Sequence, residues 1–278
     1  MSNPLSLPQT IEANGMSFGY HLLGEGPLLL MLHGFPDTAR AWDPITAPLA
    51  TAGYTVVAPY LRGYAPSDIP TVDTKVDDLA RDVIALIDAF GAETAIVVGH
   101  DWGAAAAYAA AALAPERISR LATVALPHPA GFKPKIMDYW PARHFVTFKT
   151  KSAPAKFIAD DFRGLRAIYQ RWSPRWEMAD DDLADSIRCL SNPDSLNAVF
   201  GYYRAAERKP SPLMRRRIDL PTVAFAGQSD GVVPLRAFGE AAGRFTGDYR
   251  VVELPGGHFL HREDPALFAE RLLEELAR

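Results

Sequence analysis

Two patterns of hydrophobic and polar positions alternate along this chain. Apolar runs, typical of strands that are buried on both faces of a sheet, lie at residues 28–32, 54–59, 95–98, 121–126 and 222–226, and a further strand is expected at residues 249–254. Between them, apolar residues recur at the three- and four-residue spacing of an amphipathic helix, most clearly from Thr74 to Phe90, where Gly91 is a stop signal. Strands that alternate with helices predict a parallel α/β sheet with short right-handed crossovers.

Further elements are expected around this framework. Residues 16–23 alternate loosely between apolar and polar, which predicts an antiparallel edge strand. Helices are expected over residues 41–52 and 235–243, and a closing helix over residues 265–278.

The alternation stops at Pro127-His128-Pro129. From about Pro129 to Lys209 no buried-strand run occurs, helical segments are interrupted by prolines, and three of the five tryptophans lie here. We interpret this stretch as a helical cap inserted between two strands of the sheet. The expected organisation is a core over residues 1–128 and 210–278, with a cap over residues 129–209.

The most informative motif is Gly99-His100-Asp101-Trp102-Gly103. It follows the run at residues 95–98 and opens a small-residue stretch up to Ala114, which reproduces the strand–turn–helix of a nucleophile elbow. The elbow residue is strained and needs small neighbours, so that strand and helix pass closely. The nucleophile position holds Asp101 rather than a serine.

Two further candidates, Asp230 and His258, each follow a predicted strand. The carboxyl ends of parallel strands meet at the edge where open α/β sheets bind ligands, so both should lie near Asp101. An Asp between glycines is more often a turn residue, and a loop His is usually solvated. Three candidates in the order nucleophile, acid, base, each at a strand end, favour a catalytic triad instead.

Four motifs together carry a family resemblance: His33-Gly34-Phe35-Pro36, the Asp101 elbow, Gly227-Gln228-Ser229-Asp230 and Gly256-Gly257-His258-Phe259. The chain resembles the α/β-hydrolase superfamily over essentially its whole length, and within it the epoxide hydrolase and dehalogenase branch. The resemblance implies a mostly parallel eight-stranded sheet with helices on both faces and an inserted helical cap.

The resemblance also implies a reaction without a cofactor. A carboxylate at the elbow is ionised at neutral pH and displaces at an sp³ carbon, so Asp101 would open an epoxide and form a covalent alkyl ester. His258, held by Asp230, would activate the water that hydrolyses this ester to release a vicinal diol. The family assigns the oxyanion hole to the backbone N–H groups of Phe35 and Trp102.

Epoxide hydrolases of this branch donate hydrogen bonds to the epoxide oxygen from two cap residues. The segment 200–204 resembles the aromatic-Tyr-Arg end of such a cap and selects Tyr203. The segment 144–148 aligns with the stretch that begins at the first donor, which selects His144, as in a bacterial subgroup that pairs a His with a Tyr. Tyr139 and Tyr169 are the other candidates, and they join Phe35 and Trp102 as expected substrate contacts.

Two other functions stay open. A hydrolytic dehalogenase would use the same nucleophile, but many haloalkane dehalogenases carry Asn where this chain has Phe35. Fluoroacetate dehalogenases carry Arg at the positions of Trp102 and Ala105. A non-catalytic ligand-binding protein on this scaffold is the second alternative. An esterase is disfavoured, because no Ser occupies the elbow.

The composition limits the kinds of binding partner that are expected. The 278 residues carry a net charge of −4, so no nucleic-acid partner is expected, and the aromatic cap suits a small apolar epoxide. The single cysteine, Cys189, excludes an internal disulfide and a Cys-based metal site. Residues 1–10 lack a signal-peptide pattern, and no apolar run reaches the ~20 residues that span a bilayer. We expect a cytoplasmic protein with no membrane partner, as a monomer or a homodimer.

The remaining histidines are not expected to be catalytic. His33 and His100 are interpreted as structural residues whose ring nitrogens bind loop backbone. His128 and His261 are interpreted as ordinary loop residues. No His, Asp and Glu residues have the sequence spacing of a metal site, and no metal is expected.

Overall fold

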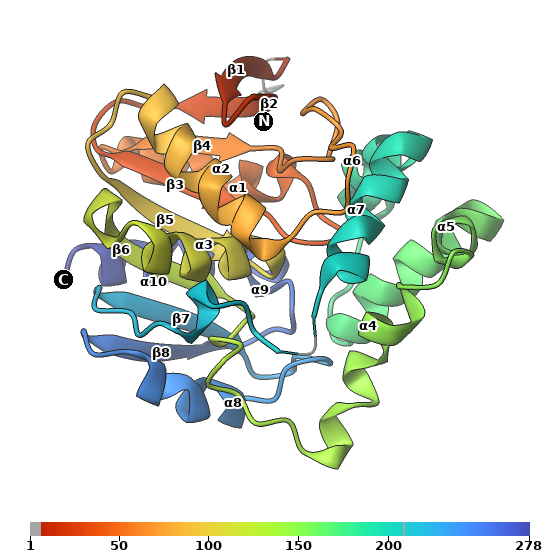
Figure 1. Ribbon diagram of the computed structural model, residues 1–278. Helices are drawn as coiled ribbons and strands as arrows, with labels where there is room; N and C mark the ends of the chain where they lie inside the picture. The colour runs from red at the N-terminus through yellow and green to blue at the C-terminus, as the bar shows by residue number, and fades with distance from the viewer. Residues whose placement is uncertain (1–6, 208) are drawn as a thin grey trace.

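The computed structural model describes residues 7–207 and 209–278, so most of the first ten residues, where no signal peptide is expected, lie outside it. Its strands form one eight-stranded sheet in the order β1-β2-β4-β3-β5-β6-β7-β8 (Figure 1). The strands are β1 (Gln9–Ala13), β2 (Met16–Leu23), β3 (Leu28–Leu32), β4 (Thr55–Pro59), β5 (Ala95–His100), β6 (Ile118–Val124), β7 (Thr222–Gly227) and β8 (Tyr249–Leu254).

Most strand pairs are parallel, as predicted. Among the described strands only β1–β2 and β2–β4 are antiparallel, and β4, β3, β5, β6, β7 and β8 pair in parallel. The prediction that residues 16–23 form the edge of the sheet is wrong, because β1 pairs with the outer side of β2. The five residues of β1, QTIEA, include only two apolar side chains, so no hydrophobic pattern marked this strand.

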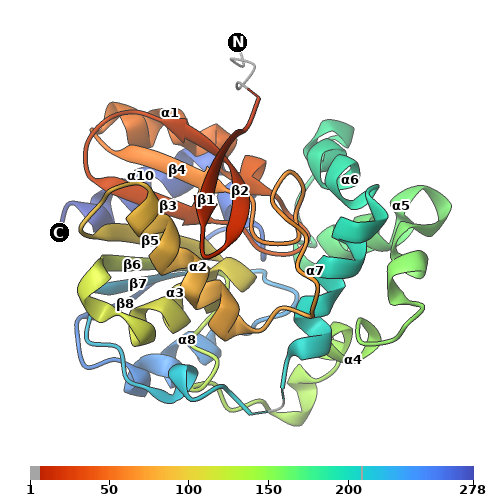
Figure 2. The same cartoon turned by 45° about the horizontal axis from the view of Figure 1, so that its top comes forward.

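Helices cover both faces of the sheet, as Figures 1 and 2 show. On one face α2 (Val76–Ala89) packs against α3 (Trp102–Leu113), and on the other α1 (Asp43–Thr51) packs against α10 (Pro265–Leu276). The alanines of α3 are buried from Ala104 to Ala112. The expected helix at residues 235–243 is divided into α8 (Arg236–Glu240) and a 3₁₀ turn.

Between β6 and β7 the described residues form helices and loops but no strand. In Figures 1 and 2 this helical insertion lies to one side of the sheet. The boundaries at residues 129 and 209 remain predictions. The insertion contains the 3₁₀ helices η3 (Ile136–Asp138), η4 (Pro141–Arg143) and η5 (Asp180–Leu183), and the α-helices α4 (His144–Thr147), α5 (Ala153–Trp172, interrupted at residues 159–162), α6 (Ala184–Leu190) and α7 (Pro193–Ala205).

Within the described residues, no helix combines the length and the apolar character needed to cross a lipid bilayer.

The turn between β5 and α3 is held in a strained backbone conformation. Asp101 has φ 49° and ψ −113°, a region that side chains other than glycine rarely adopt. A Cβ at Gly99 would overlap the carbonyl of Gly103, and a Cβ at Gly103 would overlap the carbonyl of Leu32. The glycines on both sides of Asp101 are therefore required by close backbone contacts.

Gly103→Ala is expected to lower the free energy of unfolding by at least about 3 kcal/mol, because rigid backbone has to move. Gly239→Ala is the matched control: Gly239 lies in α8, a Cβ there meets nothing within 4 Å, and alanine in a helix is expected to add about 0.5–1 kcal/mol. Urea unfolding measures both variants. Equal stability of the two would contradict this account of the elbow.

Candidate active site

Asp101, His258 and Asp230 lie together at the carboxyl edge of the sheet. Asp101 begins α3 directly after β5, Asp230 follows β7, and His258 follows β8. The Nδ1 atom of His258 lies 2.9 Å from Oδ2 of Asp230, and its Nε2 atom lies 3.6 Å from Oδ2 of Asp101. The imidazole therefore bridges the two carboxylates, with one ring nitrogen toward each.

Asp230 is fixed by the backbone that follows it. Its Oδ1 atom accepts hydrogen bonds from the N–H groups of Val232 and Val233, at 2.7 and 3.0 Å. Oδ2 of Asp230 is left to accept a hydrogen bond from Nδ1 of His258. Nδ1 therefore carries a proton, and Nε2 is the ring nitrogen that faces Asp101.

The charges of the three groups are coupled. Burial alone would lower the pKa of His258, but Asp230 and then Asp101 outweigh it and raise the pKa to about 10. Burial alone would raise the pKa of Asp101, but the nearby His258 and its charge outweigh the burial and hold the pKa below its ordinary value. With Asp101 ionised, His258 is thus an imidazolium at neutral pH.

One oxygen of the Asp101 carboxylate is bound to the backbone, and the other faces the imidazole of His258. Oδ1 accepts a hydrogen bond from the backbone N–H of Phe35 at 2.9 Å. The N–H of Trp102, in the first turn of α3, has no acceptor within the helix. The two backbone donors expected for an oxyanion thus come from the loop after β3 and from the start of α3.

Tyr203 in α7 lies over this carboxylate. Its side chain is 1% exposed, and its ring contacts Phe35 and Trp102 with centroids 5.2 and 5.4 Å apart. Burial, and then the charge of Asp101, raise the pKa of its hydroxyl well above the ordinary value. The phenol stays protonated, and its hydroxyl donates to no acceptor among the described residues.

His144 at the start of α4 lies beside Tyr203 and near Asp101. It is 3% exposed, and its ring centroid is 5.8 Å from that of Tyr203 and 4.8 Å from that of Trp172. Burial lowers its pKa to about 3, so the imidazole is neutral and keeps one N–H. The structure therefore brings Tyr203 and His144 together beside Asp101, as the sequence suggested.

Trp172 at the end of α5 is a site residue that the sequence did not single out. Its ring lies edge-on to His258 at 4.9 Å, and its carbonyl accepts hydrogen bonds from the N–H groups of His258 and Gly231 at 3.1 and 3.0 Å. One residue of the insertion thereby holds the loops of both the base and the acid. In the sequence, Trp172 is one of many aromatic residues of the insertion, and nothing in its position distinguished it as a site residue.

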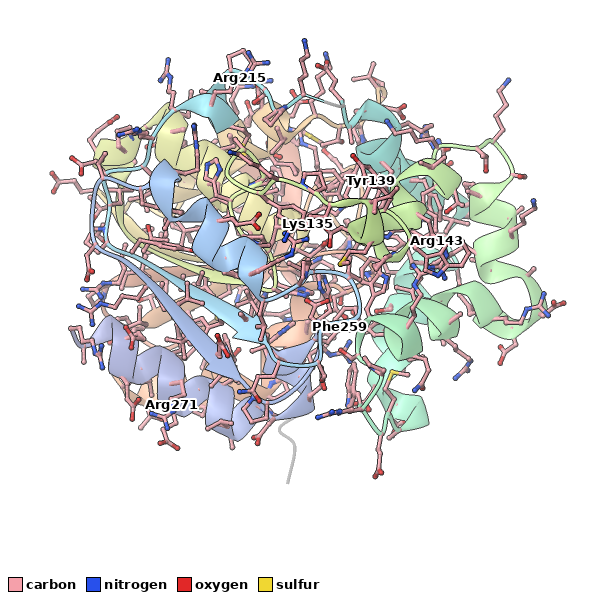
Figure 3. All side chains as sticks on the ribbon, turned by 90° about the horizontal axis from the view of Figure 1, so that it is seen from below. Lys135, Tyr139, Arg143, Arg215, Phe259 and Arg271 are labelled. Carbon is pink, nitrogen blue, oxygen red and sulfur yellow. The ribbon has the colours of Figure 1, made fainter. Side chains whose placement is uncertain are left out.

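Tyr139 and Tyr169 are corrected as substrate contacts. Tyr139, labelled in Figure 3, is 64% exposed to solvent. The hydroxyl of Tyr169 donates to Asp37 at 2.5 Å, and its ring packs on Phe259 at 4.5 Å, so it is a buried structural residue.

His33 and His100 bind backbone, as predicted. The Nε2 atom of His33 accepts from the N–H of Leu61 at 3.0 Å, which leaves Nδ1–H to donate to the carbonyl of Gly34. Nε2 of His100 lies 3.0 Å from the carbonyl oxygen of His258 and positions that loop. Burial lowers the pKa of His33 to about 4 and that of His100 to about 3, so both are neutral.

His128 and His261 are not ordinary loop residues, since both are fully buried. Nδ1 of His128 accepts a hydrogen bond from the N–H of Ala130 at 3.2 Å. His261 packs on Trp42, with ring centroids 4.6 Å apart.

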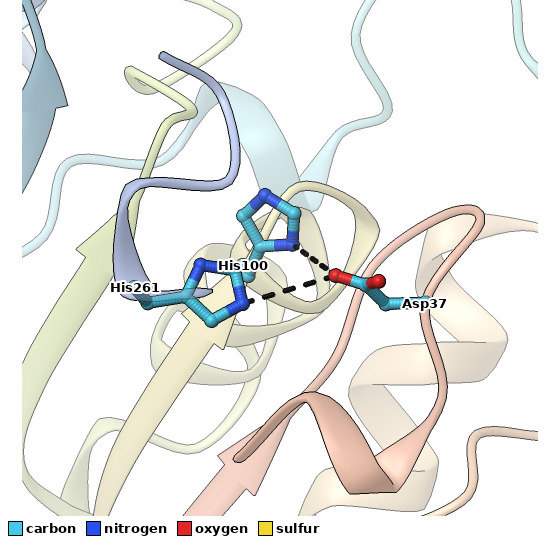
Figure 4. Close-up of side chains that lie close together, drawn as sticks. All are labelled: Asp37, His100 and His261. Carbon is cyan, nitrogen blue, oxygen red and sulfur yellow. Dashed lines mark ion pairs between the residues drawn. The ribbon is translucent and has the colours of Figure 1, made fainter. Parts of the chain in front are cut away.

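His261 also belongs to a buried cluster with Asp37 and His100, whose potential ligand atoms lie within 4.8 Å of one another (Figure 4). Sequence spacing missed it because the three residues come from segments far apart in the sequence: the loop after β3, the end of β5, and the helix at Leu260–Glu263. The guanidinium of Arg262 already binds Asp37. A divalent cation here would add uncompensated charge to a buried site, which is costly. We interpret the cluster as a structural polar network.

The coupling of charges predicts the titration of His258. Asp101→Asn removes one of the two carboxylates, so the imidazole pKa should fall from about 10 toward the neutral range. Histidine ring resonances in a ¹⁵N NMR titration measure this pKa, and mass spectrometry checks that the introduced amide is not hydrolysed back to a carboxylate. An unchanged pKa would contradict the bridging role.

Comparisons with known proteins agree with this architecture. A family model described as the alpha/beta hydrolase fold matches residues 27–265. An epoxide hydrolase of Caballeronia sordidicola is 39% identical, with 96% of this chain and 92% of the relative covered. The AB hydrolase superfamily protein YfhM of Bacillus subtilis is 30% identical, with 96% and 97% covered. The solved structure of epoxide hydrolase A from Mycobacterium thermoresistibile has a TM-score of 0.83 at 26% identity, covering 97% of this chain and 98% of that chain. The chain therefore belongs to the α/β-hydrolase fold family, among its epoxide hydrolases.

Proposed function

We propose that this protein hydrolyses a small apolar epoxide to a vicinal diol through an alkyl ester on Asp101. The observation that carries the proposal is the carboxylate of Asp101, with Oδ1 tied to a backbone N–H and Oδ2 directed toward His258. The similarity to epoxide hydrolases supports the substrate class.

In the first step, Oδ2 of Asp101 attacks a carbon of the epoxide ring and the C–O bond breaks. The epoxide oxygen keeps the electron pair of this bond and takes a proton from Tyr203. The N–H of His144 donates a second hydrogen bond to this oxygen. A protonated phenol and a neutral imidazole suit this task, because both donate hydrogen bonds and neither carries a charge that would compete with Asp101 for the positive charge of His258.

Forming the ester changes the state of His258. The negative charge of Asp101 disappears, so one of the causes of the high pKa of His258 is lost and the imidazolium releases its proton. The phenolate of Tyr203 takes up one proton and becomes a phenol again, which accounts for the proton that His258 releases. The neutral imidazole then acts as the base in the second step.

In the second step, His258 removes a proton from water, and the resulting hydroxide attacks the carbonyl carbon of the ester. The carbonyl oxygen is Oδ1, which the N–H of Phe35 already holds, and the N–H of Trp102 is the second donor to the negative charge. Collapse of this intermediate breaks the ester bond, and the alkoxide of the product takes the proton held by His258 and leaves as the diol. The second proton of the water is then on the carboxyl of Asp101 and passes to His258, which restores the starting ion pair.

A halide leaving group is less well served by this site. The rings of Phe35 and Phe148 contact Tyr203, the ring of Phe200 packs on both of them, and none of the three rings offers an N–H donor. Ala105 is 6% exposed and uncharged, so no cation follows the nucleophile to hold a haloacetate.

His258→Gln should trap the ester. With its base removed, the variant still alkylates Asp101, and intact-protein mass spectrometry with styrene oxide should show a 1:1 adduct that maps to Asp101. Asp101→Asn is the control, with no adduct and turnover lowered at least about 10³-fold. Full turnover by a verified Asp101→Asn protein would rule the mechanism out.

Tyr203→Phe should lower kcat for epoxide opening by about 10²-fold, with little change in stability, because the phenol gives its proton only in the reaction. Tyr202→Phe is the matched control: the hydroxyl of Tyr202 donates to the carbonyl of Arg62 at 2.8 Å, so its loss costs about 1 kcal/mol of stability and leaves kcat unchanged.

Steady-state assays of both variants should measure diol from styrene oxide, and chloride and fluoride from haloalkanes and fluoroacetate. If Tyr203→Phe keeps its epoxide turnover and halide release is the faster wild-type reaction, the dehalogenase function replaces the one proposed.

A further inference from the structure

Part of the insertion presents large apolar side chains to solvent. In the stretch 131–156, which we call the interfacial segment, six such side chains are exposed over the consecutive short helices η3, η4 and α4. They are Ile136 (90% exposed), Met137 (69%), Tyr139 (64%), Trp140 (73%), Phe145 (41%) and Val146 (73%). Exposed apolar patches of this kind mark surfaces that bind a ligand, another protein or a membrane.

The inward positions of the interfacial segment are already occupied. Asp138 is buried, accepts from the backbone N–H of Lys135 and pairs with Arg236 of α8. His144 and Phe148 are buried against the active site. The exposed side chains are therefore not poorly packed core residues, because the segment is anchored by other residues.

The charge of this segment is opposite to that of the remaining chain. It contains six Lys and Arg residues and one acidic residue, Asp138, whereas the rest of the chain carries a net charge of −9. Lys133, Lys135 and Lys149 are exposed, and Arg143 lies over the Trp140 ring at 4.4 Å. Figure 3 shows Lys135 and Arg143 on this part of the insertion.

We propose that the interfacial segment docks on the surface of an anionic lipid membrane. Exposed Trp, Tyr and aliphatic side chains interspersed with Lys and Arg suit the boundary between acyl chains and negatively charged headgroups. The negative remainder of the molecule is repelled by the same surface, which orients this side of the insertion toward it. The expectation of no membrane partner concerned spanning segments, whereas this contact lies on the surface.

A second copy of the chain fits this surface less well. A two-fold contact would place the six cations of one segment against the six of the other, without an exposed acidic residue to pair with them. An acidic peptide would match the charge but gives no reason for the exposed aliphatic side chains.

The docked surface leads to the candidate active site. Phe145 is part of the interfacial segment, and its ring also contacts Tyr203 and Trp102, with centroids 5.4 and 6.4 Å apart. An apolar epoxide concentrates in lipid, so docking would bring this side of the candidate site close to the substrate. The docking itself does not depend on the proposed reaction, and its test uses no substrate.

Vesicle co-sedimentation tests the proposal with the full chain. Binding is expected to vesicles of phosphatidylcholine with about 30% phosphatidylglycerol, to weaken with added salt, and to be absent with phosphatidylcholine alone. Trp140 fluorescence should shift to the blue on binding, and Trp140→Phe should remove most of the shift, because Trp140 is the most exposed tryptophan: Trp42 and Trp172 are fully buried, and Trp102 and Trp176 are half-buried.

Variants identify the surface. Lys149→Glu with Lys151→Glu, and Val146→Ser with Met137→Ser, should each lower the partition coefficient at least about tenfold. Arg271→Glu on α10 and Val72→Ser, as exposed as Val146 at 73%, are the matched controls and should bind like the wild type.

Two results would overturn the proposal. One is equal binding of wild type and both double variants to the anionic vesicles, or no binding by any of them. The other is a dimer in analytical ultracentrifugation that the same double variants dissociate, which would make a second copy the occupant of this surface.

Discussion

Everything around the candidate site depends on one buried imidazole between two carboxylates. His258, Asp230 and Asp101 together carry one positive and two negative charges, and such a group is stable in a protein interior only when each member keeps its partners. The parallel sheet satisfies this condition because three of its strands, β5, β7 and β8, end at one edge. The strained elbow, the backbone donors to Asp230 and the bond from His100 to the His258 loop all maintain this arrangement.

The sequence predicted the sheet and the triad because both depend on local signals. Most of the strands are recognisable as apolar runs, and each candidate residue comes shortly after a predicted strand. One topological rule therefore brings Asp101, Asp230 and His258 together. The cap donors were harder, because His144 and Tyr203 were selected by resemblance, with no periodic pattern to place them. The structure puts both beside Asp101, although the reaction that uses them remains a proposal.

What the sequence missed depends on contacts between distant segments. The network of Asp37, Tyr169 and Arg262 joins a loop, the insertion and α9 (Leu260–Glu263), and no short spacing in the sequence indicates it. β1 was missed because a five-residue edge strand with few apolar side chains has the composition of a loop. Tyr139 was misplaced for the opposite reason, since an aromatic residue near the pocket in sequence lies outside it in space.

The carbonyl of Trp172 ties one end of the insertion to the triad. It accepts hydrogen bonds from the loops of both His258 and Asp230, so the end of α5 moves only if the base and its acid move with it. The insertion therefore has a fixed side and a free side. Among the described residues no hydrogen bond joins α4 to the loops of His258 and Asp230, so the triad does not fix the position of that helix.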